Sequence, residues 1–181
     1  MHDPNPLVEG FKELKFRGIK TKINILEKEA KKLNEAYIKY MKTKRPFVIL
    51  KLAMTMDGRI ATKTGDSKYI TGTDARKYVH QLRGEADAVM VGINTVLKDN
   101  PKLTPRLVKG REPMKIVVDS ELRMPMSCNL MKYPSKLIIA TTNKASKNKI
   151  NKFYQKGVNV IVLKSKKGLV DLKELMKELG K

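Results

Sequence analysis

The alternation of apolar and polar residues divides the chain into short strands and amphipathic helices. Continuous apolar runs, typical of strands covered on both faces, occur at 47–54, 86–92, 114–119, 136–142 and 158–163. Between and after them, the pattern predicts helices over 71–84, 94–100, 145–156 and 172–179. Strands that alternate with helices predict an α/β fold with a largely parallel sheet flanked by helices.

Polar residues mark the predicted starts of three of these helices. Thr71 or Thr73 can cap the first, Asn94 or Thr95 the second, and Asp171 the last. In each case a side-chain oxygen can accept a hydrogen bond from a free amide of the first turn. These helices are therefore expected to start with side-chain caps.

The run 47–54 contains a charged residue, Lys51, which is unusual in a strand that is expected to be buried. Asp57-Gly58 follows and predicts a tight turn, because glycine accepts the positive φ that such turns require.

The first forty-five residues have a different pattern. A short helix is predicted near 9–17, a strand near 20–26 and a longer helix over 27–41. Apolar and amide side chains repeat in the longer helix at three- and four-residue spacing, which predicts one buried stripe: Ala30, Leu33, Asn34, Tyr37 and Tyr40.

Composition limits the size of the protein and indicates the cellular compartment in which it is expected. The 181 residues, 41% of them hydrophobic, are enough for one domain with an appendage. No apolar run is long enough to span a bilayer, and the N-terminus lacks the pattern of a secretory signal. The single cysteine, Cys128, cannot form an internal disulfide. A cytoplasmic protein without a membrane partner is expected.

The net charge of +21 raises nucleic acid as a partner. However, the lysines are scattered, and few aromatic residues lie among them to stack on bases. A solvated basic surface that also attracts anionic small molecules is the preferred interpretation, and nucleic-acid binding is the weaker alternative.

Small and polar residues follow the predicted strands at their carboxyl ends. Gly92 and Thr95 follow one strand, and Ser120 follows the next. Parallel sheets bind ligands at this edge. A phosphate or a ribose hydroxyl can be received there, although Gly92 taken alone fits a simple turn between a strand and a helix.

The strongest signal is an ordered set of short motifs between Lys51 and Arg106. It reads Lys-Leu-Ala-Met-Thr-Met-Asp-Gly-Arg at 51–59, Gly-Asp-Ser-Lys-Tyr-Ile-Thr-Gly at 65–72, His-Gln-Leu-Arg at 80–83, Gly-Ile-Asn-Thr-Val-Leu-Lys-Asp-Asn-Pro at 92–101 and Leu-Thr-Pro-Arg at 103–106. As one set it resembles the reductase domain of the bifunctional riboflavin-biosynthesis deaminase-reductase, the RibD family.

The resemblance implies a dihydrofolate-reductase-like fold and an NADPH-dependent oxidoreductase. The substrate implied is 5-amino-6-(5-phosphoribosylamino)uracil, a phosphorylated aminopyrimidine whose ribosyl group is reduced to ribityl. Positions that match the family's cofactor contacts are Ala53, Tyr69, Thr95, Asp99 and Ser120. Positions that match its substrate contacts are Ser67, Arg83, Leu103 and Arg106.

The chemistry of these residue types agrees with such roles. Arg83 and Arg106 can bind a phosphate with two-pronged hydrogen bonds. Asp99 can accept hydrogen bonds from sugar hydroxyls, and Lys51 can donate a proton or stabilise charge on the ring oxygen. Lys51 and Asp99 are therefore the candidate catalytic residues. Each residue also has a structural alternative: an ion pair for Arg83, a turn cap for Asp99 and a solvated strand end for Lys51.

The remaining candidate site residues have weaker support from the sequence. His80 is interpreted as a packing or surface residue, and His2 and Cys128 have no partners at metal-ligand spacing, so no metal site is predicted. Tyr69 stands where the family often has a tryptophan.

The resemblance also divides the chain. Asp3 to Pro6, Gly18-Ile19 and Leu33 to Glu35 resemble the tail of the family's deaminase domain, so 1–45 is expected to be a remnant of that domain and 46–181 an incomplete reductase domain. The family's zinc motifs and its Glu-Gly-Gly loop do not occur in the chain, which implies truncation at both ends and no deaminase activity. The resemblance also implies weak NADPH binding by this chain unless another chain supplies the loop, and reduction is therefore expected of the full-length protein rather than of this chain alone. A homodimer is left open. The alternative functions are a related reductase acting on a pterin and a basic nucleic-acid-binding module.

Overall fold

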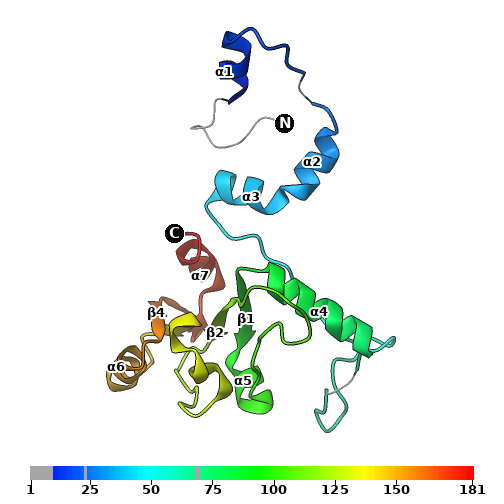
Figure 1. Cartoon of the computed structure of the whole chain (residues 1–181). Coiled ribbons are helices and arrows are strands. Elements are labelled where there is room, and N and C mark those ends of the chain that lie inside the picture. The colour runs from blue at the N-terminus through cyan, green and yellow to red at the C-terminus, as the bar shows by residue number, and fades with distance from the viewer. Residues whose placement is uncertain (1–9, 23, 68–69) are drawn as a thin grey trace. The chain divides into compact units, whose positions relative to one another are not determined.

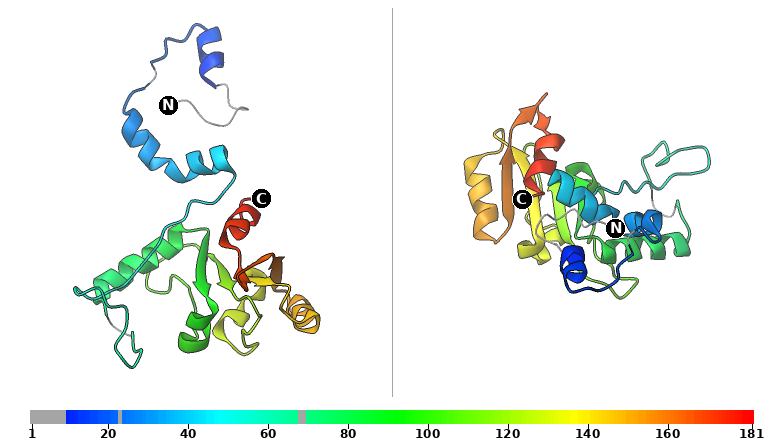
Figure 2. Two further views of the ribbon diagram at one scale, coloured as in Figure 1. Left: turned by 180° about the vertical axis from the view of Figure 1, so that it is seen from behind. Right: turned by 90° about the horizontal axis from the view of Figure 1, so that it is seen from above.

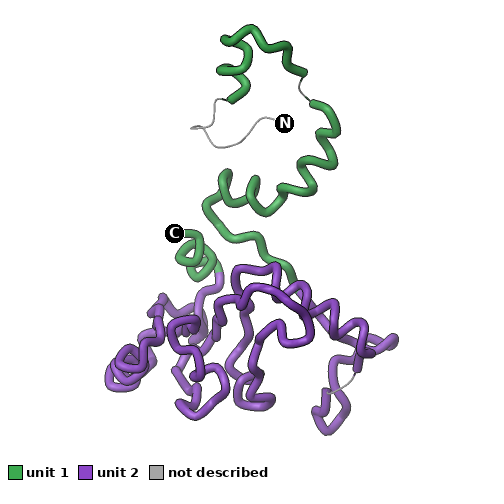
Figure 3. The backbone as a smooth tube through the Cα atoms, viewed as in Figure 1, with its two compact units in different colours: residues 1–50, 173–181 green, residues 51–172 purple. Residues whose placement is uncertain are grey.

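The computed structural model describes residues 10–22, 24–67 and 70–181. The backbone divides into two compact units: residues 51–172, and residues 1–50 together with 173–181 (Figure 3). None of the described helices is both long enough and apolar enough to cross a membrane.

The larger unit is built on a parallel sheet of four strands. They are β1 (Ala88–Gly92), β2 (Met114–Val118), β3 (Leu137–Thr142) and β4 (Asn159–Leu163), and they lie side by side in chain order (Figure 1). In register, Met90 lies opposite Ile116, and Ile139 lies opposite Val160. The predicted parallel sheet is confirmed, and so are four of the five predicted strands.

The connections between the strands pack on one face of the sheet. They contain α5 (Ile93–Asp99), the short 3₁₀ segments η1 (Asn129–Lys132) and η2 (Pro134–Lys136), and α6 (Lys147–Gln155), which lies beside β4 (Figure 2). Alternate strand residues, such as Val117, Ile139 and Val160, form the core with Val96 of α5 and Phe153 of α6. Right-handed crossovers that always step in the same direction place every connection on the same side of a sheet.

Helix α4 (Thr73–Glu85) precedes the sheet, as predicted, but neither α4 nor α5 has a side-chain cap. Their N-cap residues are Gly72 and Gly92, both with extended backbones. Thr71 lies before the cap position of α4, while Thr73 and Asn94 are already helical. The predicted threonine and asparagine caps are therefore wrong, because these side chains do not stand where a cap can reach the first amides.

A two-stranded hairpin that the apolar pattern does not reveal follows β4. Its strands are β5 (Ser165–Lys166) and β6 (Leu169–Val170), joined by Lys167 and Gly168 at φ of 51° and 80°. Both turn residues thus have the left-handed backbone that a tight two-residue hairpin requires. The amide of Val170 donates a hydrogen bond to Ser120 Oγ at 3.0 Å, so the hairpin is tied to the end of β2.

The run 47–54 is not a strand, contrary to the prediction. It is irregular and exposed, with Leu50 80% and Ile49 65% accessible. No described strand pairs with it. An extended segment needs a neighbouring strand to satisfy its backbone groups, and an apolar pattern alone does not provide one. The predicted turn at Asp57-Gly58 is confirmed, with Gly58 at a φ of 77°.

The smaller unit contains α1 (Gly10–Phe16), α2 (Glu27–Leu33), α3 (Glu35–Thr43) and nearly all of α7 (Leu172–Glu178). The helix predicted at 9–17 is confirmed. The strand predicted at 20–26 is wrong for its described residues, because Asn24 and Leu26 have positive φ angles of 62° and 49°.

The helix predicted over 27–41 is interrupted at Asn34. The side chain of Asn34 donates to the carbonyl of Ala30 at 2.9 Å, and its backbone leaves the helical region at φ −105°, ψ 18°. No residue of α2 or α3 is buried, and Leu33 is 86% exposed. The predicted buried stripe is therefore wrong.

Candidate functional site

Two pockets lie in the larger unit, and both border α5. The first, here called the strand-end pocket, has a volume of about 440 Å³. It is formed where β1 and β2 end and where the β5–β6 hairpin folds back; its lining is Gly92, Ile93, Asn94, Thr95, Val118, Ser120, Glu121, Arg123, Leu169, Val170 and Leu172. The predicted position at the carboxyl ends of the strands thus corresponds to a real pocket.

The polar side of the strand-end pocket is held by a small network. The buried carboxylate of Asp119 accepts a hydrogen bond from the amide of Met124 at 2.8 Å, and Arg123 Nε lies 3.9 Å from its other oxygen. Arg123 also donates to Asn94 Oδ1 at 3.3 Å. The guanidinium of Arg123 is thereby held at the pocket, where it is half exposed. Thr95 and Ser120 add two hydroxyl groups.

The second pocket, here called the arginine pocket, has a volume of about 380 Å³. It brings together four of the residues predicted from the sequence; its lining is Arg83, Asp99, Asn100, Pro101, Lys102, Leu103, Arg106 and Asn129. Arg83 comes from α4, Asp99 ends α5, and Arg106 lies on the loop that follows. Within the described part of the chain, neither Arg83 nor Arg106 forms an ion pair with a carboxylate.

The arginine pocket therefore contains three cations, Arg83, Lys102 and Arg106, and one carboxylate, that of Asp99. Burial, followed by the neighbouring guanidinium of Arg106, lowers the pKa of Arg83 from its ordinary value. The arginine stays charged near neutral pH, since a guanidinium begins from a very high pKa. Cations that lie close together repel one another, and an anion bound between them relieves the repulsion. The excess of positive charge makes this pocket suitable for an anion.

The backbone around the arginine pocket is unusual. Asn100 and Leu103 have positive φ angles of 42° and 55°, although neither is glycine. The Asn129 amide donates to Asn100 Oδ1 at 2.7 Å, and its side chain donates to the Asn100 carbonyl at 2.8 Å. These contacts hold the left-handed residue Asn100 with which α5 ends.

The two pockets are neighbours along α5. Thr95 lines the strand-end pocket and Asp99 the arginine pocket. Residues four apart on a helix lie on the same face, about 6 Å apart along the axis. A ligand in one pocket can therefore approach a ligand in the other.

Other predicted residues are not brought to these pockets. Lys51, Ala53 and Ser67 line neither of them, and Lys51 and Ser67 are exposed. Tyr69 lies outside the described residues. The roles predicted for all four therefore stay predictions.

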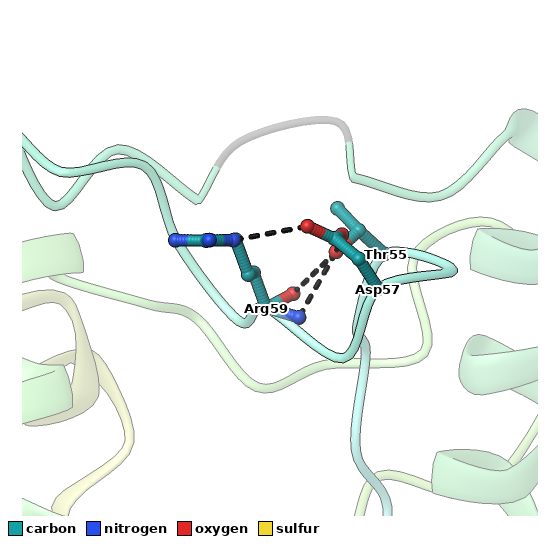
Figure 4. A network of polar contacts seen from close by, with 3 residues as sticks. All are labelled: Thr55, Asp57 and Arg59. Atoms are coloured by element: carbon teal, nitrogen blue, oxygen red, sulfur yellow. Dashed lines mark hydrogen bonds and ion pairs between the residues drawn. The ribbon is translucent and has the colours of Figure 1, made fainter.

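A polar turn follows Lys51 and Ala53. Asp57 accepts hydrogen bonds from the Thr55 hydroxyl and from Arg59 Nε, the latter at 2.9 Å, and the Arg59 amide donates to Thr55 Oγ1 at 3.0 Å (Figure 4). The bonds from Thr55 and then Arg59 lower the pKa of Asp57. The Asp57 carboxylate is thus occupied within its own turn.

Sequence reasoning missed Arg123, Asn100 and Asn129 as parts of the pockets. Asn100 and Asn129 are far apart in the chain, and nothing in their local pattern links them. Arg123 follows the predicted strand 114–119, and its position near the carboxyl end of that strand is the signal that could have identified it as a pocket residue. Among the described residues, no group of three His, Cys, Asp or Glu side chains could hold a metal ion.

Comparison with known proteins identifies the family. The family model of the RibD C-terminal domain matches residues 46–181. The chain belongs to the RibD C-terminal domain family. The riboflavin biosynthesis protein RibD of Actinobacillus pleuropneumoniae is 43% identical over 182 residues, which cover 98% of this chain and 48% of that protein. The expected RibD relationship is confirmed.

Solved RibD structures agree with the fold. Acinetobacter baumannii RibD superposes with a TM-score of 0.82 at 32% identity, covering 98% of this chain and 49% of that chain. A diaminohydroxyphosphoribosylaminopyrimidine deaminase/5-amino-6-(5-phosphoribosylamino)uracil reductase from Thermotoga maritima gives 0.80 at 35% identity, covering 98% and 48%. The expected dihydrofolate-reductase-like α/β fold is confirmed. The chain spans about half the length of the relatives it matches.

Proposed function

We propose that the larger unit is the reductase module of riboflavin biosynthesis. It would reduce the ribosyl group of 5-amino-6-(5-phosphoribosylamino)uracil to ribityl with NADPH. The observation that carries the proposal is the arginine pocket, where Arg83 and Arg106 lie together without a carboxylate partner among the described residues. Membership of the RibD C-terminal domain family supports the reaction class.

In this proposal the arginine pocket binds the substrate. Arg83 and Arg106 hold the phosphate, because planar guanidinium groups bind phosphate oxygens in pairs. Asp99, which also lines the pocket, accepts hydrogen bonds from sugar hydroxyls, and Leu103 contacts the substrate with its buried side chain. Ser67 is proposed as a further hydroxyl donor.

The strand-end pocket is proposed to hold the cofactor. Its donor set fits a phosphorylated nucleotide, since Thr95 and Ser120 provide hydroxyls and Arg123 a cation. Bound there, NADPH would supply the hydride for the sugar. Ala53, Tyr69 and Asp99 are the other proposed cofactor contacts. Lys51 is proposed to donate a proton or to stabilise charge on the ring oxygen.

The remaining parts of the proposal concern the whole protein. Residues 1–45 are proposed to be the tail of a deaminase domain, and 46–181 to belong to the reductase domain. A cytoplasmic location and a homodimer belong to the same proposal. Light scattering of the purified chain tests the dimer directly.

The reductase proposal is tested by following NADPH absorbance with the phosphorylated substrate. We expect Asp99→Asn and Lys51→Gln to lower kcat by at least about tenfold, as expected for loss of a proton-transfer or charge-stabilising group. We expect Arg83→Gln to raise KM chiefly, because it removes a phosphate contact. Lys147→Gln, on the first turn of α6, is a matched control that also removes one positive charge. Unchanged rates in the first two variants would exclude them from catalysis, and a substrate without phosphate that reacts equally well would contradict the arginine-pocket assignment.

A further inference from the structure

His80 is the only residue of α4 that is buried, with 4% of its surface exposed. It lies one helical turn before Arg83, a lining residue of the arginine pocket, and contacts its side chain. A buried polar side chain is costly unless it forms hydrogen bonds, so its contacts are informative.

The imidazole of His80 bridges α4 and the loop that carries Arg106. Its Nε2 lies 3.4 Å from Nη1 of Arg83, and its Nδ1 lies 3.4 Å from the amide nitrogen of Leu107. The carbonyl of Thr104 also faces the ring as a hydrogen-bond acceptor. The residue thus contacts both of the segments that supply the two arginines.

The charge of the partners favours one tautomer. A guanidinium and a backbone amide can only donate, and a neutral imidazole accepts at one ring nitrogen only, so it accepts from Arg83 or from Leu107 but not from both. Hydrogen bonds to charged groups are the stronger ones, which favours acceptance from Arg83 at Nε2. The proton then resides on Nδ1, and the Leu107 amide is left as a close neighbour of that nitrogen.

We propose that His80 is a positioning residue of the arginine pocket: its uncharged imidazole accepts a hydrogen bond from the guanidinium of Arg83 at Nε2 and lies against the Arg106 loop with its Nδ1 edge. The inference rests on the proposed phosphate-binding role of this pocket. It assigns a function to a residue that touches neither substrate nor cofactor in that proposal.

The charges around His80 agree with an uncharged ring. Arg83 approaches it from α4 and Arg106 from the loop, while Lys102 and Asp99 line the adjoining pocket. Burial, then Arg83 and Arg106, lowers the pKa of His80. A charged imidazole would lose its acceptor for Arg83 and add a third cation beside two arginines.

The tautomer can be measured directly on the unmodified chain. The sequence has two histidines, so nitrogen NMR of the labelled protein shows two imidazoles, and His2→Gln assigns them. We expect His80 to be uncharged and protonated on Nδ1 at neutral pH. Protonation on Nε2 would overturn the proposed hydrogen bond to Arg83.

Phosphate binding tests the positioning role. Titration calorimetry with inorganic phosphate and ribose 5-phosphate is compared for the unmodified chain, His80→Phe, His80→Gln and the control Gln81→Ala on the exposed side of α4. We expect His80→Phe to weaken binding about fivefold, the effect of one ordinary hydrogen bond, and His80→Gln to restore most of it through its amide oxygen. Equal binding by His80→Phe would overturn the positioning role and leave the phosphate site standing. Absence of phosphate binding by the unmodified chain would overturn the phosphate site and this inference with it.

Discussion

His80 also connects the charge state of one residue to the stability of the fold. Burial and the two neighbouring arginines keep its pKa below the ordinary value of about 6.5. As the pH falls below that value, the unfolded chain takes up a proton that the folded chain still excludes. The unfolded state then binds more protons, so the free energy of unfolding falls as the pH is lowered.

We therefore expect the urea midpoint of the unmodified chain to decrease between about pH 7 and pH 5. His80→Gln removes the titrating group and keeps an amide in its place. It should show a flatter pH dependence over the same range. Parallel curves for the two proteins would mean that His80 does not contribute to the pH dependence.

Residue chemistry also explains how far the site was predictable. The resemblance to the RibD family predicts Arg83, Asp99, Leu103 and Arg106 as site residues, and the structure places all four in one pocket. The bonds that shape that pocket were not predictable, because Asn129 and Asn100 meet only after folding. Positive φ angles at Asn100 and Leu103 likewise leave no trace in an apolar pattern.

At the scale of elements, α4 and the loop that follows Arg106 approach each other closely at two glycines, Gly84 and Gly110. A Cβ added to Gly84 would lie 3.2 Å from the Cα of Gly110 and 3.8 Å from Pro105 Cβ. The backbone of the loop therefore comes so close to α4 that a side chain at Gly84 displaces it. The contact lies between the two segments that supply Arg83 and Arg106.

We expect Gly84→Ala to weaken phosphate binding more than it changes stability. Alanine gains up to about 1 kcal/mol of helix propensity, which offsets part of the strain of about 1–3 kcal/mol from overpacking. The displaced loop would move Arg106 away from Arg83. Gly72→Ala, at the other end of α4, is the control, since nothing lies within 4 Å of a Cβ there. Full phosphate affinity in Gly84→Ala would show that the close approach does not position the loop.

The elements differ in how well local sequence predicts them. Strands β1 to β4 and helices α5 and α6 are confirmed because their apolar residues face one shared core. The run 47–54 has the same composition as a strand but no partner in the described sheet, and Asn34 interrupts a helix that its periodicity predicts to be continuous. An apolar pattern therefore does not show whether a strand has a neighbouring strand to pair with. It also does not show whether a side chain competes for the hydrogen bonds of the helix backbone.

At the scale of the whole molecule, the net charge of +21 attracts anions to the protein surface without a defined binding site. Lysines are numerous in the chain, and ion pairs such as Arg111 with Asp87 and Lys31 with Glu27 offset part of their charge. Self-repulsion among the lysines destabilises the compact state and is screened by salt. A specific phosphate site must be distinguished from this general effect.

We expect the melting temperature to rise with sodium chloride and to rise further with phosphate at equal ionic strength. The first increase comes from screening, and the second includes the linkage of a bound ligand, about 2.7 kcal/mol at a hundredfold excess over Kd. Phosphate also stabilises proteins without binding a site, so the comparison must be made against Arg83→Gln and against Lys147→Gln, which removes the same charge from α6. The extra stabilisation should disappear in Arg83→Gln and persist in Lys147→Gln. Equal losses in both variants would assign the phosphate effect to net charge, because only a defined site can distinguish two cations of the same sign at different places in the fold.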